Sequence, residues 1–134
     1  MSTTAGTRLS RSQRGSAIAD FALVSVVLVP LFFGVLQLAL IWHVRTTLTS
    51  AASEGAHYGA TYSRTADDGG RRTSDVIDDV FGRRLSATVS AHETSIDGQA
   101  AVEVAVKADV PVLGFWGPTV TVEVSGHAVK EVLP

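Results

Sequence analysis

The chain has 134 residues, of which 46% are hydrophobic and 18% are charged, with a formal net charge of −2 and no cysteine. This length suits one small domain, and the apolar share is high for a soluble protein of that size. We therefore expect part of the apolar sequence to lie outside a core. The balanced charge argues against nucleic acid as a partner, and the absence of cysteine excludes disulfides, thiolate zinc sites and cysteine nucleophiles.

The first 15 residues form a basic leader. They carry Arg8, Arg11 and Arg14 and no acid, among Ser, Thr and Gly residues that offer little to bury. This composition predicts an unstructured segment with a charge of +3. Residues 45–134 hold 8 basic and 12 acidic side chains, so the short basic flank lies on the N-terminal side of the chain.

Residues 21–44 form a run of 24 residues without Lys, Arg, Asp or Glu. A helix of that length spans roughly 36 Å, enough to cross a hydrocarbon layer of about 30 Å. The positive-inside rule then puts the N-terminus in the cytoplasm and the C-terminal part outside, as a single-pass protein. Two alternatives are a buried helix and a secretory signal cleaved near Ala52, although a signal's apolar region usually has about 7–15 residues.

The boundary between leader and apolar run has the sequence Arg14-Gly15-Ser16-Ala17-Ile18-Ala19-Asp20-Phe21. If the chain were cut after Gly15, Ser16 would carry a new ammonium group, and Asp20 would lie four residues further on the same helix face. Asp20 could pair with that amine or with the amine of a neighbouring subunit, where lipid or protein excludes water. The alternative is that Asp20 marks the membrane boundary and extends to the head groups.

The segment GSAIADFALVSVVLVPLFFGVLQLALIWHVRTTLTSAASEGAHYGA resembles the N-terminal signature of the TadE/TadG-like minor pilins (pseudopilins) of tight-adherence, or Flp-type, pilus systems. Gly15 matches the residue before prepilin-peptidase cleavage, Ser16 the mature N-terminus, Asp20 the acid and Phe21 its aromatic follower. A second group, the family run, follows the apolar helix: Glu54, Gly55, Ala56, Tyr58 and Gly59. In two departures from the pattern, Asp20 stands where Glu is usual and His57 where Arg is common.

The resemblance implies a function in assembling an adhesive type IVb pilus. It implies cleavage by a prepilin peptidase, retention in the cytoplasmic membrane, and contacts with other pilin or pseudopilin subunits and with the assembly platform. After assembly, the protein would be part of an extracellular pilus. Beyond about residue 60 the resemblance is general, since only the arrangement of a small α-plus-β domain is similar.

The remaining sequence predicts a small extracytoplasmic α+β domain. The first helix is expected to cover residues 16–61, with an apolar and small-residue stripe after the membrane for packing, and residues 62–72 are expected to be a solvated linker. An amphipathic helix over 73–85 would follow, with Val76, Ile77, Val80, Phe81 and Leu85 on its apolar face. Alternating residues then predict three or four antiparallel strands to residue 134, with a hairpin turn at Asp97-Gly98.

The loop with Phe115 and Trp116 between glycines has two interpretations. It could be an exposed tip that contacts a subunit or the membrane, or its rings could fill the end of the small sheet.

Nothing in the sequence points to catalysis. The four histidines, His43, His57, His92 and His127, have no ligand-like spacing, and no phosphate loop or nucleophile motif is present. We therefore expect that the protein is not an enzyme and that it has no cofactor and no metal site. Besides the pilin-like hypothesis, the sequence leaves open a membrane-anchored binding module and an extracytoplasmic domain released from a signal peptide.

Overall fold

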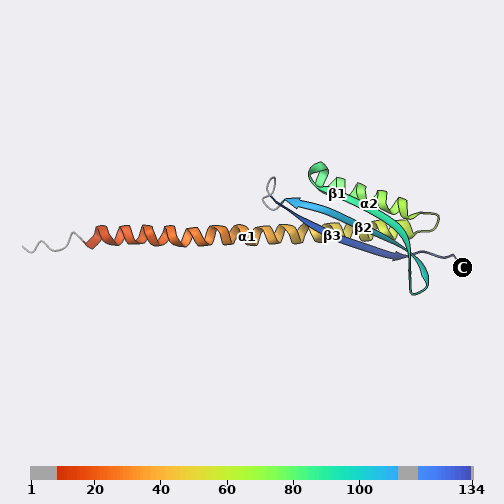
Figure 1. The fold of residues 1–134 in the computed structure, drawn as a ribbon, viewed down its shortest axis with the longest axis horizontal. Helices are drawn as coiled ribbons and strands as arrows, with labels where there is room; N and C mark the ends of the chain where they lie inside the picture. Colours follow the sequence, from red (N-terminus) through yellow and green to blue (C-terminus); the bar gives the residue numbers. More distant parts are fainter. Residues whose placement is uncertain (1–8, 112–117, 134) are drawn as a thin grey trace, which may run out of the picture. The chain divides into compact units, whose positions relative to one another are not determined.

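A computed structural model describes residues 9–111 and 118–133 of the chain (Figure 1). The elements in chain order are α1 (Leu9–Ala60), α2 (Ala66–Phe81), the 3-10 turn η1 (Gly82–Arg84), β1 (Ser86–Ile96), β2 (Gln99–Pro111) and β3 (Thr119–Val129). The chain divides into two compact units, Met1–Leu38 and Ala39–Pro134, and α1 contributes to both. The fold class is α+β, as predicted, with three antiparallel strands.

In the first unit, α1 exposes its apolar side chains. Phe21 is 75% exposed and Leu31 is 58% exposed, and none of the helix's most apolar stretch is buried inside the protein. By length and composition this helix could cross a membrane. The expectation of an unstructured leader is wrong from Leu9 onward, because α1 begins there. Residues 9–15 contain no proline, and extending an existing helix costs far less than nucleating one.

The second unit is built around a sheet with the strand order β1-β2-β3. Asp97 and Gly98 connect the first two strands with φ angles of 51° and 79°, and two adjacent positive φ values suit the two-residue hairpin turn that the sequence predicted. Alternate residues of the central strand β2 point into the core, where Val102, Val104 and Val106 are at most 1% exposed. The predicted alternation of apolar and polar residues is confirmed in this strand.

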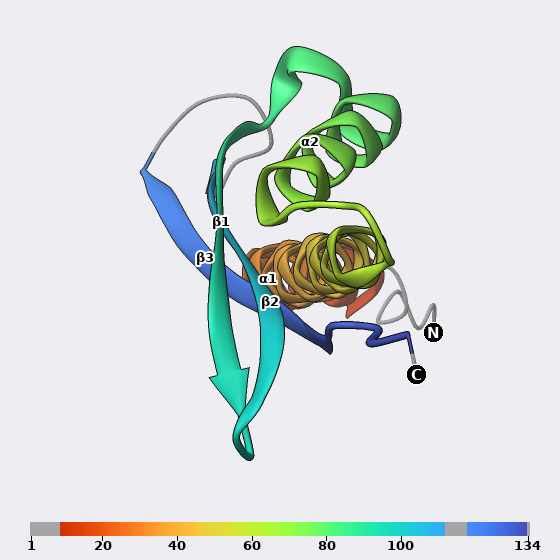
Figure 2. The ribbon, with the colours of Figure 1, turned by 90° about the vertical axis from the view of Figure 1, so that its right-hand side faces the viewer.

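One face of the sheet is covered by α2 and by residues 39–60 of α1 (Figure 2). Leu48, Ala52 and Ala56 of α1 are fully buried, so the predicted packing stripe after the apolar run is confirmed. Helix α1 and strand β3 approach closely at Gly126 of β3, where an added Cβ would lie 2.5 Å from the backbone of Ala52 in α1. The two elements run in the same direction, since the Glu131 N–H also donates to the Ala60 carbonyl further along.

The structure corrects the predicted linker over residues 62–72. Only the short connection after α1 is irregular, and α2 begins at Ala66 rather than at residue 73. A capping box starts this helix: the Thr65 hydroxyl accepts from the Asp68 N–H, and the Asp68 carboxylate accepts from the Thr65 N–H. The small domain therefore includes residues that the charge and glycine content assigned to solvent.

The predicted apolar face of the second helix is confirmed except at Val80: Ile77 is buried in the core, and the buried face also extends toward the start of α2. Its buried residues are Ala66, Gly69, Thr73 and Ile77, spaced three or four residues apart. Val76, Phe81 and Leu85 pack partly against the core, but Val80 is 55% exposed. The face is centred on small residues because α1 lies very close to this helix.

Candidate functional site on the long helix

The predicted processing residues lie on one continuous stretch of α1. Gly15 and Ser16 are helical and exposed, and a Cβ placed on Gly15 would have no heavy atom within 4 Å. Asp20 is one helical turn after Ser16 on the same face and is also exposed. Within the described part of the chain, Asp20 makes no hydrogen bond or ion pair. Its carboxylate is therefore accessible to an amine from another chain.

The family run is where α1 packs against α2. A Cβ on Gly55 would lie 1.8 Å from the Thr73 hydroxyl oxygen and 2.6 Å from the Gly69 carbonyl oxygen. A Cβ on Gly59 would lie 2.9 Å from the Thr65 carbonyl oxygen. Only glycine fits such a backbone approach without movement of one helix. These two glycines thus set the short distance between the helices.

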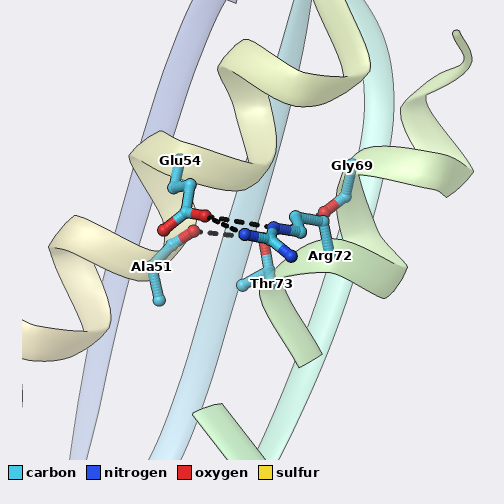
Figure 3. Close-up of polar contacts among 5 residues, drawn as sticks. All are labelled: Ala51, Glu54, Gly69, Arg72 and Thr73. Carbon is cyan, nitrogen blue, oxygen red and sulfur yellow. Dashed lines mark hydrogen bonds and ion pairs between the residues drawn. The ribbon is translucent and has the colours of Figure 1, made fainter. Parts of the chain in front are cut away.

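Polar contacts beside the glycines fix the register of the two helices (Figure 3). The Arg72 guanidinium donates to Glu54 Oε1 through Nη2 at 2.7 Å and through Nε at 3.0 Å. This hydrogen bond and the Glu54 charge raise the pKa of Arg72. Deeper in the contact, the buried Thr73 hydroxyl lies 3.0 Å from the Gly69 carbonyl oxygen and 3.3 Å from that of Ala51. The pair at the rim and the hydroxyl in the centre both link α2 to α1.

Two other members of the family run contact the core and the turn that connects α1 with α2. Ala56 is fully buried against the core. The Arg64 guanidinium carbon lies 4.6 Å from the centre of the Tyr58 ring, a cation–π contact from the turn that leads into α2. His57, at the departure from the family pattern, is exposed, and its Nδ1 is 2.8 Å from the Ser53 carbonyl oxygen of the same helix.

The residues that start α2 were not predicted from the sequence. The Asp68 carboxylate has a lowered pKa, chiefly because it accepts hydrogen bonds from the Thr65 backbone and side chain. The signal was present as Thr65-Ala66-Asp67-Asp68, which has the threonine-to-acid spacing of a capping box. Neither Arg72 nor Thr73 was predicted as a partner of the family run, since each lies 18 or more residues away along the chain.

Two of the histidines meet one acid on the sheet. His92 of β1 and His127 of β3 are the cross-strand neighbours of Glu103 on β2, and their Nε2 atoms lie 3.5 and 3.2 Å from its Oε2. Among the described residues, no group of three His, Cys, Asp or Glu side chains is arranged to hold a metal ion. Phe115 and Trp116, the possible contact loop, lie outside the described residues.

Comparison with known proteins gives one match. Residues 15–57 match the family model described as TadE-like protein, from Gly15 to the middle of the family run. No curated protein and no solved structure matches the chain. The resemblance drawn from Gly15, the apolar helix and the first part of the family run is thus confirmed: residues 15–57 are similar to the TadE-like family.

Proposed function

We propose that this protein is a minor pilin or pseudopilin that acts in assembling an adhesive Flp-type pilus. The observation that carries the proposal is the TadE-like match beginning at Gly15, immediately before an exposed helix with Asp20 at its edge. The match itself suggests a protein related to the Tad pilus, with one helix that could cross a membrane. The role is structural and needs no catalytic group or cofactor.

In the proposed maturation, a prepilin peptidase cuts after Gly15 and leaves residues 16–134. Ser16 then has a free ammonium group at the end of α1, four residues from Asp20. Removal of the leader also removes the +3 charge that favours a cytoplasmic N-terminus. In a bundle of such helices, the exposed Asp20 carboxylate pairs with the Ser16 amine of a neighbouring subunit, where exclusion of water strengthens the pair.

The core of the second unit argues against release by cleavage near Ala52. Leu48 and Ala51 are at most 2% exposed, and Val44 is 6% exposed. A cut after Ala52 would remove all three from the core, and the loss of buried Leu48 alone would cost about 2–5 kcal/mol. The packing therefore favours a second unit, called the head below (Ala39–Pro134), that stays joined to the rest of α1.

N-terminal sequencing of the purified protein tests the proposal. We expect the native chain to begin at Ser16, and a Gly15→Leu variant to keep the leader and migrate as a longer precursor. The open space at Gly15 means that the substitution disturbs no packing contact. Gly34→Leu is the matched control, because Gly34 is also helical with open space around it, and its mature protein should still begin at Ser16.

The sequencing result also separates the alternatives. An intact Met1 in the native protein would contradict processing and support an anchored binding module. A start after about Ala52 in a soluble fraction would support a released domain. A Gly15→Leu variant that is processed as well as the native chain would contradict the assigned cleavage site.

A further inference from the structure

A cleft of about 670 Å³ lies on the face of the sheet that the helices leave uncovered, and side chains of α1 also line it. Its floor includes Ser90, Ala105 and Ser125, which face one another across the three strands in register. The next cross-strand row on the same face of the sheet also lines the cleft: Thr88, Lys107 and Glu123. Arg45 and Thr49 of α1 and the strand residues Val106 and Val124 complete the lining. The volume is within the usual range of small-ligand sites, about 300–1,000 Å³.

The lining is rich in hydrogen-bond donors and carries a net charge of +1. Arg45 has no ion-pair partner among the described residues, whereas Lys107 lies 3.3 Å from Glu123. The hydroxyls of Ser90 and Ser125 make no hydrogen bond with any residue that the structure describes. A guanidinium, an ammonium and free hydroxyls at one cleft are suited to the oxygens of a phosphate group.

The position of Arg45 favours a membrane lipid as the source of such a phosphate group. Arg45 is the first charged residue after the apolar run 21–44, and Trp42, three residues earlier on α1, is 74% exposed. Tryptophan and basic residues at the end of a membrane helix lie at the level of the lipid head groups. We propose that this cleft binds the phosphodiester headgroup of an anionic membrane lipid, an inference that rests on the proposed membrane anchoring.

The charge of the cleft sets the selectivity of the site. With Lys107 partly neutralised by Glu123, one net positive charge remains, which matches the single negative charge of a glycerol phosphodiester. The side chains of Lys107 and Glu123 are 61% and 69% exposed, so the attraction is screened by salt. A zwitterionic lipid of zero net charge binds less well.

Amide NMR shifts of the full chain in neutral detergent test the proposal, with soluble short-chain phosphatidylglycerol as the probe. We expect saturable shifts at Ser90, Ala105 and Ser125. An Arg45→Gln/Lys107→Gln variant should weaken binding about tenfold or more, since each basic residue near an anionic lipid contributes about fivefold. The matched control is Arg83→Gln/Arg84→Gln, which removes two exposed charges outside the cleft and should leave binding unchanged.

A second variant, Ser90→Ala/Ser125→Ala, keeps the charge and should weaken binding severalfold. Its spectrum without lipid shows whether the sheet is intact. Absence of shifts, equal shifts with phosphatidylcholine, or equal weakening in the control variant would each overturn the proposal. Saturation by inorganic phosphate at the same concentration would overturn the lipid assignment in favour of a free oxyanion. None of these outcomes affects the start at Ser16, so the proposed function is judged separately.

Discussion

Substitution of Gly55 by alanine tests whether the family run sets the distance between α1 and α2. The new Cβ would lie 1.8 Å from the Thr73 hydroxyl oxygen and 2.6 Å from the Gly69 carbonyl oxygen, so Thr73 must rotate and α2 must also move. Overpacking of this kind costs about 1–3 kcal/mol, and losing the buried Thr73 hydrogen bond adds about 1 kcal/mol. The higher helix propensity of alanine returns about 1 kcal/mol, which leaves a net loss of about 2 kcal/mol.

Native-state hydrogen exchange of the β2 amides measures this loss, because the central strand opens only when the head unfolds. A loss of about 2 kcal/mol corresponds to roughly thirtyfold faster exchange. Gly34→Ala is the matched control: its Cβ meets open space, so β2 protection should not change.

Combining Gly55→Ala with Thr73→Ala gives the sharper test. The second substitution removes the oxygen at 1.8 Å, so the double variant should be less destabilised than the sum of the two single variants by about 1 kcal/mol or more. Strict additivity would refute the contact between the new Cβ and the Thr73 hydroxyl, and unchanged protection in Gly55→Ala would refute the close backbone approach.

Three further predictions concern other parts of the chain. Gly126→Ala should destabilise the head by about 1–3 kcal/mol, because its Cβ would lie 2.5 Å from the Ala52 backbone; unchanged β2 exchange would contradict this. Since the pKa of Asp68 is lowered, the contribution of its carboxylate to stability should be present above pH 3.8, its ordinary pKa, and be lost as the pH falls through the folded-state pKa. Hydrogen exchange of amides in the first turn of α2 should therefore become faster at low pH in the native chain. An equal response to acid in Asp68→Asn would disprove this. Asp20→Asn should reduce crosslinking to neighbouring pilin subunits while Asp20→Glu retains it, with cleavage at Ser16 measured separately; equal crosslinking in both variants would argue against the amine pairing.

The parts of the fold that the sequence predicts correctly have strong local patterns. The alternation around Val102, Val104 and Val106 and the Asp97-Gly98 turn predict the first hairpin from neighbouring residues alone. The stripe that contains Leu48 and Ala52 predicts that α1 continues into the head. Such patterns need no knowledge of the partner surface, because an apolar face must be buried against something.

The start of α2 was misplaced because glycines and charges outweighed the capping-box spacing at Thr65, and tertiary contact overrides local propensity there. Gly69 and Gly70 weaken an isolated helix, and the acids and arginines around them indicate solvent. In the structure, Gly69 lies against the Gly55 backbone, where an added Cβ would be 2.5 Å from the Gly55 carbonyl oxygen. A residue that is poor for an isolated helix is thus required by the packing of two helices.

The candidate sites differ in how far sequence alone could find them. Gly15, Ser16 and Asp20 are neighbours on one helix, so their spacing is visible in the sequence. The cleft at Arg45 depends on which residues of three strands face one another, and this follows only from the register that pairs Ser90, Ala105 and Ser125. Sequence periodicity gives the face of a strand but not its partner in a neighbouring strand.

The two ends of the matched segment therefore have different physical functions. At Gly15 the surroundings are open, so packing does not explain a glycine there, whereas the proposed recognition by a peptidase would. At Gly55 the surroundings are closed, and packing alone requires a glycine. Processing should consequently be sensitive at the first position and indifferent at the second, while head stability should respond in the opposite way. Measuring both properties in both variants separates the maturation signal from the docking of α2 on one continuous helix.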